Sequence, residues 1–385
     1  MNILAIETSC DETAISLVDA QGSLEAPQFT ILGNALLSQI DIHKEYGGVF
    51  PALAKREHAK NSVPLLKSIL KHTPRKTWSL SDEQKTKLSE ILEREPELLE
   101  QFVAYIQTIE KPDIDVIGVT EGPGLEPALW VGINFARALA YIWNLPLIGI
   151  NHMEGHIASV LFEDRPITFP SLALLISGGH TELVHAQTWG TYKKIGQTRD
   201  DAVGEAFDKV ARLMGLPYPG GPKISEFAKE HRVHHPHHTE TWNLPRPMLH
   251  TKDFDFSFSG LKTAVRYAIT NKGKLTDDDK YELAREFEDA VTEVLIKKTL
   301  LALEETGAKS LIIGGGVSAN THICTTFKNT LEESDVTLHI PERSLSTDNA
   351  LMIAAALYTR ITQNPALLTT YDHTLRANGT LSLEH

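Results

Sequence analysis

The sequence predicts a duplicated α/β protein, because two kinds of segment each occur twice in the same order along the 385-residue chain. Residues 3–22 and 172–190 each contain an apolar strand, a short polar loop and an alternating strand that ends near a glycine, as in a β-hairpin. Residues 116–143 and 311–331 each contain a strand, a glycine-rich loop and an amphipathic helix. We therefore expect two lobes of similar architecture.

The predicted lobes are an N-terminal lobe, residues 1–150, and a C-terminal lobe, residues 151–350. If the two lobes bring their glycine-rich loops together, the central cleft between them is where a ligand is expected. Residues 351–382 are expected to form a helix and a tail that pack back on the N-terminal lobe. Leu383-Glu384-His385 resembles the start of a vector-encoded tag.

The composition fits an ordinary folded protein and excludes several other classes. With 37 Lys and Arg against 50 Asp and Glu, the net charge of -13 argues against a generally basic nucleic-acid binder, although a local basic patch can still contact phosphates. Two cysteines are typical of a reducing compartment. No apolar run reaches the ~18 residues of a membrane span, and the chain starts with a predicted strand, so we expect a cytoplasmic protein without membrane contact.

Two segments between the repeats lack an obvious chemical role. Residues 73–110 are predicted to form an inserted helical hairpin on the surface, with helices at 82–94 and 97–109 broken by Pro96, and with Ser81 as the first helix's cap. Residues 231–238 contain five histidines in eight positions. Clustered histidines can bind metal, but the proline and the polar flanks favour an exposed loop.

The strongest local pattern is a pair of histidines, His152 and His156, at helical spacing. Residues four apart lie on one face of a helix and can share one metal ion, although many such pairs are only solvated side chains. Asp348 opens another predicted helix and could supply a carboxylate, and two imidazoles with one carboxylate suit Fe(II) or Zn(II). Glu154 does not complete the HExxH pattern of zinc proteases.

Glycine-rich turns form the second group of candidates. Ser177-Gly178-Gly179 lies in the turn of the second hairpin, where backbone N–H groups can bind phosphate or carboxylate oxygens, and residues 314–320 join a strand to a helix. Neither segment has the spacing of a Rossmann or Walker motif. An ordinary turn is the alternative for the hairpin.

Carboxylates complete the candidates. In the first hairpin Asp11 or Glu12 could orient a nucleophile or a metal-bound water, with a solvated turn as the alternative. On the helix predicted to start within residues 200–209, Glu205 or Asp208 could bind ribose hydroxyls, or both could be ordinary surface acids.

Eight motifs carry a resemblance to a known family. In chain order they are IETSCDET, EGPGLEPALWVGINFA, NHMEGH, LLISGGHTEL, GEAFDKVARLMGLPYPGGP, FSFSGLKTAV, GGGVSAN and STDN. This set is similar to the bacterial tRNA N6-adenosine threonylcarbamoyltransferases, the TsaD family, over about residues 1–72 and 111–360. The resemblance implies an α/β fold of the duplicated, two-lobed actin, hexokinase and Hsp70 type (ASKHA), with its central cleft.

The resemblance also implies an activity and its site. The family transfers threonylcarbamoyl from threonylcarbamoyl-AMP to N6 of adenosine 37 in tRNAs that read ANN codons. It implies one divalent metal ion per subunit, Fe(II) in preference to Zn(II), held by His152, His156 and Asp348. Asp11 and Glu12 occupy the positions of functional acids. Adenylate contacts would come from Leu175, Ile176, Ser177, Gly178, Gly179, Asp208, Gly221 and Asn320.

The resemblance further implies macromolecular partners: tRNA, an inactive paralogue of the same fold and a small P-loop ATPase. The segment at 73–110 departs from the family pattern. Positive and imidazole side chains on the early helices form the best candidate patch for the tRNA backbone, namely His43, Lys44, Lys55, Arg56, His58 and Lys60. The alternative functions are a metalloprotease, suggested only by the histidine pair, and a non-catalytic scaffold.

Overall fold

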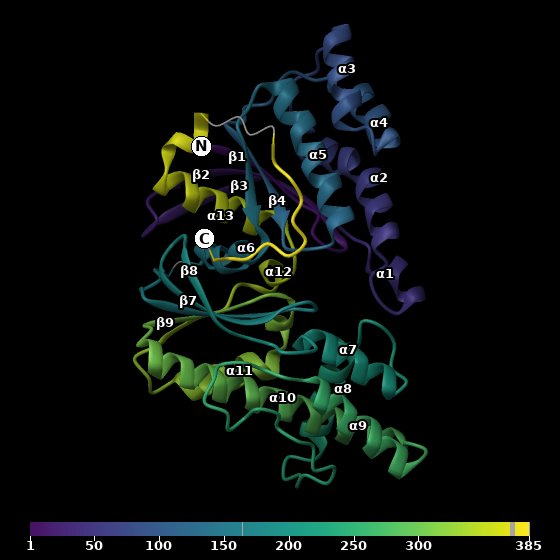
Figure 1. The fold of residues 1–385 in the computed structure, drawn as a ribbon, viewed down its shortest axis with the longest axis vertical. Helices are drawn as coiled ribbons and strands as arrows, with labels where there is room; N and C mark the ends of the chain where they lie inside the picture. Colours follow the sequence, from purple (N-terminus) through teal and green to yellow (C-terminus); the bar gives the residue numbers. More distant parts are fainter. Residues whose placement is uncertain (164, 370–373, 385) are drawn as a thin grey trace. The chain divides into compact units, whose positions relative to one another are not determined.

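The computed structural model describes residues 1–163, 165–369 and 374–384 (Figure 1). The chain forms two compact units. Unit 1 contains residues 1–166 and 348–383, and unit 2 contains residues 167–347 with Glu384. The first division therefore falls after residue 166, later than the boundary near 150 expected from the sequence, because the helix that begins at His152 packs on a helix from the C-terminal part of the chain.

Unit 1 is built on a five-stranded mixed sheet in the order β3-β2-β1-β4-β5. The first three strands are antiparallel neighbours, and β4 and β5 run parallel to β1. The strands are β1 (Asn2–Glu7), β2 (Glu12–Gly22), β3 (Pro27–Ser38), β4 (Val116–Gly122) and β5 (Leu147–Asn151).

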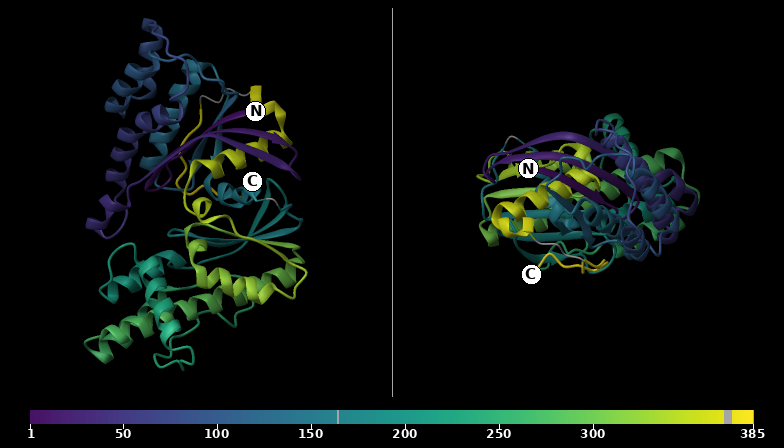
Figure 2. Two further views of the ribbon diagram at one scale, coloured as in Figure 1. Left: turned by 180° about the vertical axis from the view of Figure 1, so that it is seen from behind. Right: turned by 90° about the horizontal axis from the view of Figure 1, so that it is seen from above.

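Helices cover both faces of this sheet (Figure 2). Ile117 and Val119 of β4 belong to the apolar cluster with α5, whereas Gly118 between them faces Leu357 of α13, as the alternation of a strand requires. The helical elements of unit 1 are α1 (Ile40–His43), η1 (Lys44–Tyr46), α2 (Pro51–Ile69), α3 (Asp82–Ile91), α4 (Pro96–Ile106), α5 (Glu126–Trp143), α6 (His152–Ala158), η2 (Ser159–Phe162), α13 (Ala350–Gln363) and η4 (Pro365–Thr369).

Unit 2 has the same strand plan, in the order β10-β9-β6-β7-β8. Its strands are β6 (Ser171–Ile176), β7 (Thr181–Thr188), β8 (Thr191–Gln197), β9 (Ser310–Gly314) and β10 (Thr337–His339). Its helical elements are α7 (Val203–Leu213), α8 (Gly220–His234), α9 (Ser259–Lys272), α10 (Asp277–Thr306), η3 (Gly316–Ala319), α11 (Thr321–Leu331) and α12 (Arg343–Ser346). Apolar side chains of β6, β9, α7, α10 and α11 share one core.

The predicted duplication is confirmed. The two expected hairpins are β1-β2 and β6-β7, and the two strand-loop-helix segments are β4-α5 and β9-α11, each next to its hairpin strand in parallel pairing. In each sheet three antiparallel strands are followed by two parallel ones. None of the helices in the described ranges has the length and apolar character of a membrane span.

The inserted segment is helical as predicted. The prediction that it lies on the surface was wrong for the apolar face of α4, which is buried. Ser81 and Gln84 form the expected capping box of α3, and α4 begins at Pro96. Leu98 and Phe102 of α4 are buried, and the Phe102 ring meets Phe135 of α5 edge-on, with centroids 6.1 Å apart. Apolar residues at helical spacing on α4 therefore extend the core of unit 1.

Candidate metal and nucleotide sites

The two histidines lie on α6, directly after β5 in unit 1. Asn151 caps this helix, because its side-chain oxygen accepts hydrogen bonds from the N–H groups of Met153 (2.9 Å) and Glu154 (3.4 Å). His152 and His156 are one turn apart, and their rings lie edge-to-face with centroids 4.7 Å apart. The sequence prediction of a shared helical face is confirmed by this geometry.

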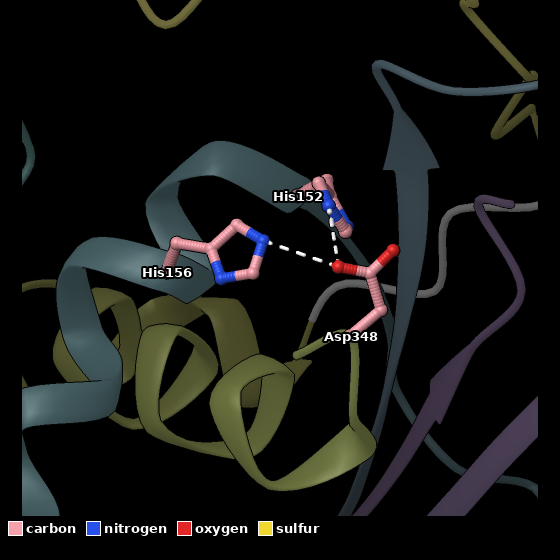
Figure 3. Close-up of side chains that lie close together, drawn as sticks. All are labelled: His152, His156 and Asp348. Atoms are coloured by element: carbon pink, nitrogen blue, oxygen red, sulfur yellow. Dashed lines mark ion pairs between the residues drawn. The ribbon is translucent and has the colours of Figure 1, made fainter. Parts of the chain in front are cut away.

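Asp348 brings the third side chain to the same place (Figure 3). It precedes α13, whose cap residue Asn349 accepts a hydrogen bond from the Met352 N–H. Asp348 Oδ1 lies 3.4 Å from His152 Nε2 and 3.2 Å from His156 Nε2. Ligands about 2.0–2.2 Å from one zinc or iron ion are separated by roughly 3.0–3.5 Å, so these three atoms already have a suitable spacing.

Glu7 at the end of β1 holds the first histidine in place. Its Oε2 lies 3.1 Å from His152 Nδ1, which leaves His152 Nε2 directed at Asp348. Glu7 is fully buried, and it also accepts hydrogen bonds from the Thr120 hydroxyl and the Ser9 N–H. A carboxylate on the far nitrogen of a ligand histidine fixes its tautomer and raises its basicity.

The electrostatics of this group favour a positive charge. Burial alone would raise the pKa of Asp348, but the charges and hydrogen bonds of His152 and His156 lower it far below its usual value. Burial opposes a charged His152, yet Asp348 and Glu7 raise the pKa of that imidazole well above normal. His156 is 1% exposed, and its Nε2 has only the 3.2 Å ion pair with Asp348, so a metal ion there would satisfy this buried nitrogen. The residues therefore fit a divalent cation.

The candidate acids of the first hairpin are Asp11 and Glu12, and the charge of Asp348 acts on Glu12. Burial, the charge of Asp11 and the charge of Asp348 raise the pKa of Glu12 to about 9, so Glu12 keeps its proton at neutral pH. Asp11 is buried, and its carbonyl accepts the Gln39 N–H. Glu12 therefore tends to keep its proton beside Asp11 in the metal-free protein.

Part of the candidate tRNA patch was wrong. His43 and His58 are fully buried and bond to neighbouring groups: His43 to Gln39, and His58 to the Thr13 hydroxyl and the Cys10 carbonyl. These two histidines brace the first hairpin instead of facing solvent. The four remaining cations of the patch each pair with an acidic neighbour, as in the 3.2 Å pair of Lys55 with Glu95.

Glu154 does not contribute to the metal group. It is buried, and its Oε2 accepts from Arg360 of α13 at 2.8 Å (Nε) and 2.6 Å (Nη2). An ion pair of this kind removes the carboxylate that a zinc protease would use as its general base. The sequence interpretation that Glu154 points elsewhere is confirmed.

In unit 2 the turn between β6 and β7 is held by Ser177. Its hydroxyl accepts from the N–H groups of Gly179 (3.3 Å) and His180 (3.1 Å), and its carbonyl accepts from Gly204 at the start of α7 (3.1 Å). A Cβ added at Gly178 or Gly179 would meet nothing within 4 Å. The backbone of the turn is therefore held by the Ser177 hydroxyl, while the space beside Gly178 and Gly179 is unobstructed.

The glycine loop after β9 lies against this turn. Leu175 of β6 pairs with Gly314, and a Cβ at Gly315 would come within 2.5 Å of the Ile176 carbonyl oxygen. Gly315 has φ +90, a conformation that favours glycine. Leu175 and Ile176 are fully buried, so they can offer a ligand only their backbone. The carboxyl ends of parallel strands in such sheets are common ligand sites.

Asp208 and Gly221 meet at the start of α8. Asp208 Oδ1 accepts from the N–H groups of Gly220 (2.7 Å) and Gly221 (3.3 Å). Burial raises the pKa of Asp208, while these two hydrogen bonds oppose the shift. Asp208 thus fixes the path of the loop before α8 and is half-buried.

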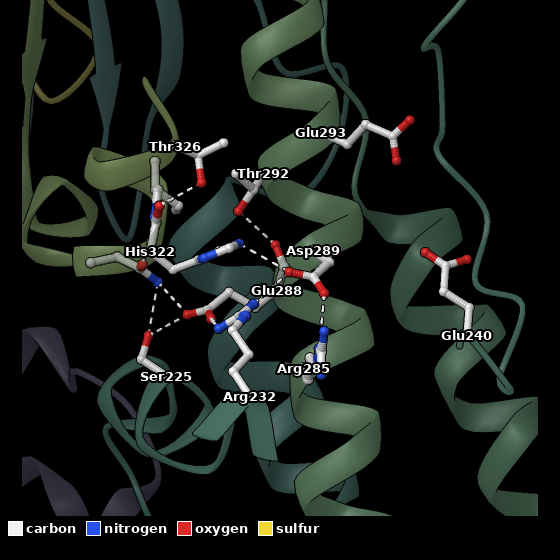
Figure 4. A network of polar contacts seen from close by, with 12 residues as sticks. Ser225, Arg232, Glu240, Arg285, Glu288, Asp289, Thr292, Glu293, His322 and Thr326 are labelled. Atoms are coloured by element: carbon white, nitrogen blue, oxygen red, sulfur yellow. Dashed lines mark hydrogen bonds and ion pairs between the residues drawn. The ribbon is translucent and has the colours of Figure 1, made fainter. Parts of the chain in front are cut away.

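A polar network that includes Ser225, Arg232 and Glu288 joins α8 to α10 (Figure 4), and Asn320 at the start of α11 bonds to it. Its side-chain oxygen caps α11 at the Ile323 N–H (3.0 Å), and its amide donates to Ser225 (2.8 Å) and Glu288 (2.7 Å). Arg232 also donates to Glu288, which is fully buried. These bonds use the Asn320 amide within unit 2, so a nucleotide contact would have to share or replace them.

Comparison with known proteins agrees with the fold and the motifs. The family model described as "TsaD: tRNA N6-adenosine threonylcarbamoyltransferase" matches residues 30–77 and 92–355. The chain belongs to the tRNA N6-adenosine threonylcarbamoyltransferase family. The match omits residues 78–91, which contain α3, so the departure from this family is narrower than the 73–110 segment expected from the sequence.

Individual relatives give the same result. The chain is 41% identical to the tRNA N6-adenosine threonylcarbamoyltransferase of Burkholderia lata over 365 residues, covering 92% of this chain and 91% of that protein. It is 39% identical to the Nitrosomonas europaea enzyme of the same name over 385 residues, covering 100% and 98%. Full-length HypF is similar in fold, with a TM-score of 0.54 and 12% identity over 94% of this chain and 46% of HypF. The predicted ASKHA fold is confirmed.

Sequence reasoning missed Glu7, Thr120 and Glu288. Glu7 had a readable signal, because a charged residue directly follows the apolar strand Ile3–Ile6, and a buried carboxylate needs partners. Glu288 had none, since it lies in the middle of a long helix with many acids, and only the packing of α8 reveals its role.

Proposed function

We propose that this chain transfers the threonylcarbamoyl group from threonylcarbamoyl-AMP to N6 of adenosine 37 in tRNAs that read ANN codons. Family membership supports the reaction class. One observation links the proposal to particular residues. Ligand atoms of His152, His156 and Asp348 lie close together, beside the buried Glu7.

His152, His156 and Asp348 would hold one divalent ion, Fe(II) in preference to Zn(II). When bound, the ion supplies a Lewis acid that polarises the carbamoyl carbonyl or orients the threonyl carboxylate. Glu7 keeps His152 in the tautomer that such binding needs. The helix caps Asn151 and Asn349 fix the backbone from which the three ligands project.

Unit 2 would bind the adenylate. The turn at Ser177, Gly178 and Gly179 would bind phosphate oxygens, and the ligand would replace the bonds that the Ser177 and Gly179 N–H groups make to the His180 carbonyl and the Ser177 hydroxyl. The buried Leu175 and Ile176 would contribute main-chain atoms only. Asp208, Gly221 and Asn320 would position the ribose and base. Their bonds to the starts of α8 and α11 keep them in fixed places before the ligand arrives.

Asp11 and Glu12 would handle the proton of the reaction. A bond forms between adenine N6 and the carbamoyl carbon, the bond from that carbon to the AMP phosphate oxygen breaks, and N6 loses one proton. The carboxylate of Asp11 or of Glu12 can accept that proton. Adenine N6 is a weak nucleophile, so positioning would contribute much of the rate.

The proposed partners are tRNA, an inactive paralogue of the same fold and a small P-loop ATPase, all in the cytoplasm. The exposed apolar side chains of unit 1 lie on β3 and around η1, and they include Ile31, Leu32, Tyr46 and Phe50. Such residues suit a protein partner better than a polynucleotide. tRNA would reach the site through a base that is flipped out of the anticodon loop.

The test is a reconstituted assay with threonylcarbamoyl-AMP, a tRNA that reads an ANN codon and the two partner proteins, with nucleosides of the digested tRNA quantified by mass spectrometry. We expect threonylcarbamoyl-adenosine to form, and a tRNA with guanosine at position 37 to stay unmodified. Absence of product with every partner present would contradict the proposal. Release of peptides from casein would instead favour a protease. We do not expect this result, because Glu154, the nearest candidate for a general base, is paired with Arg360.

A further inference from the structure

A second group of metal-binding side chains lies in unit 2, in the histidine-rich segment. His231, His238 and Glu282 each place one ligand atom within 4.8 Å of the others. The prediction of an exposed loop was wrong for His231 and His238, which are 8% and 10% exposed. It holds for the exposed His237 between them in sequence.

Three separate elements supply this group. His231 lies in the last turn of α8, His238 follows in the connection to α9, and Glu282 lies in the second turn of α10. The rings of His231 and His238 meet edge-to-face, with centroids 4.8 Å apart. An ion bound here would therefore join α8, the connecting segment and α10.

His238 is already oriented as a metal ligand. Its Nε2 lies 3.0 Å from Oε1 of Glu286, a buried carboxylate that also accepts from the N–H groups of Thr241 and Trp242. Because an ionised carboxylate only accepts, Nε2 carries the hydrogen and the lone pair of neutral His238 is on Nδ1. That Nδ1 lies 3.6 Å from Glu282 Oε1, close to the roughly 3.3 Å between two ligands of a tetrahedral zinc ion.

His231 provides the second indication of a ligand. Its Nδ1 is buried and makes no hydrogen bond, an arrangement that costs stability unless an ion or another group satisfies it. His235 stacks on His231 with centroids 4.6 Å apart and is exposed, so it is within reach as a further ligand after a side-chain rotation.

The charges around the group suit a divalent cation. Glu282 and Glu286 contribute two carboxylates. Arg285 on the same helix donates to the His235 carbonyl at 2.6 Å and lies 3.5 Å from Asp289, an acid that also pairs with Arg232. Two imidazoles and a carboxylate are typical ligands of zinc and its neighbours in the first transition row, and they do not suit Ca²⁺ or Mg²⁺.

We propose that His231, His238 and Glu282 bind one Zn²⁺ ion, separate from the His152 group in unit 1, and that this ion fastens the segment after α8 to α10. Glu282 is anchored for this role, since it accepts from the Thr241 hydroxyl (2.8 Å) and from Trp242 Nε1 (3.1 Å). The site does not depend on the proposed transferase activity, because it shares no residue with the groups assigned to that reaction.

The test counts zinc ions bound per chain by equilibrium dialysis, using the full-length protein without a polyhistidine tag. We expect His231→Ala/His238→Ala to bind one ion fewer than the wild type, and His237→Ala, the matched control from the same segment, to bind the wild-type number. The His156→Ala variant, combined with the double variant, should lose a further ion. An unchanged zinc count in His231→Ala/His238→Ala would overturn the proposal.

Thermal unfolding with and without Zn²⁺ distinguishes the loss of a zinc ligand from a general folding defect. Without metal, Glu282→Gln should unfold at a somewhat lower temperature than the wild type, because the glutamine oxygen can replace only one of the two carboxylate oxygens that accept from Thr241 and Trp242. The comparison therefore uses the increase caused by zinc in each protein. Added Zn²⁺ should raise the unfolding temperature of the wild type more than that of Glu282→Gln. Equal increases in both proteins would contradict a zinc ligand at this position.

Discussion

The two units have one strand plan but opposite chemistry at corresponding loops. In unit 1 the loop between β4 and α5 is filled by the chain itself: the Gly124 N–H donates to the Gly379 carbonyl, the Leu125 N–H donates to the Ser9 carbonyl, and a Cβ at Gly122 would overlap the Asn378 carbonyl. In the corresponding loop of unit 2, between β9 and α11, a Cβ added at Gly316 would meet nothing within 4 Å, although one at Gly315 would come within 2.5 Å of the Ile176 carbonyl oxygen. Of these two loops, the one in unit 2 is therefore open at Gly316.

The charged groups show the reverse distribution. Unit 1 places Glu7 and Asp348 beside two imidazoles, so the ends of its strands attract a cation. The turn from Ser177 to Thr181 in unit 2 contains no carboxylate, and its backbone N–H groups, two of which donate to the Ser177 hydroxyl, are of the kind that binds anions. In the proposed function, the metal ligands therefore belong to unit 1 and the adenylate contacts to unit 2.

The largest effect is expected from His156→Ala, which removes one ligand of the unit 1 group. We expect transferase activity to fall by at least about 100-fold, because even residues that only support metal ligands typically contribute 10–100-fold. The measurement is the initial rate of threonylcarbamoyl-adenosine formation. The exposed His72 provides the control, and His72→Ala should keep the wild-type rate. Equal rates in both variants would contradict the role of His156.

A somewhat smaller effect is expected from Glu7→Gln, which keeps the size of the side chain and removes its charge. His152 then loses the carboxylate that fixes its tautomer, so metal affinity should weaken by about 10–100-fold. Titration with a competing chelator measures this affinity. Glu83→Gln, at an exposed position of α3, should leave it unchanged. Wild-type affinity in Glu7→Gln would show that Glu7 does not support the metal ligands.

Two glycine substitutions separate folding from binding in unit 2. Gly315→Ala combines φ +90 with a Cβ 2.5 Å from the Ile176 carbonyl, and should lower the free energy of unfolding by about 1–3 kcal/mol. Gly178→Ala meets no neighbour, so stability should be unchanged while affinity for threonylcarbamoyl-AMP falls about tenfold, or 1.4 kcal/mol. Denaturant unfolding and calorimetry measure the two quantities. Full affinity in Gly178→Ala would show that the turn does not contact the adenylate.

The smallest effect concerns the dependence of stability on pH. In the metal-free protein Glu12 has a pKa raised to about 9 from its usual 4.5, so the folded state binds more protons than the unfolded state between these values. Stability should therefore fall as pH rises through this window. Glu12→Gln, which cannot ionise, should show a flatter profile in denaturant unfolding from pH 5 to 9. Parallel profiles would mean that Glu12 titrates normally.

Much of the fold and of the unit 1 site was predictable from the sequence, because both depend on the local spacing of apolar, glycine and histidine residues. Apolar strands, glycine turns and the i, i+4 histidines indicated both hairpins and the α6 group, and Asp348 could be paired with them because it opens a helix. Burial was not predictable at His58, His231 and His238. The sequence around a histidine does not show whether its imidazole faces solvent or bonds to a buried carbonyl or carboxylate. That depends on how helices that are distant in the sequence pack together.

The central claim is that one cation is held by His152, His156 and Asp348. An anomalous-scattering map of crystals grown with Fe(II) or Zn(II), recorded at the absorption edge of the metal, tests it most directly. We predict a peak about 2.0–2.2 Å from His152 Nε2, His156 Nε2 and Asp348 Oδ1. A catalytically active crystal form with no peak between these three atoms would contradict the claim.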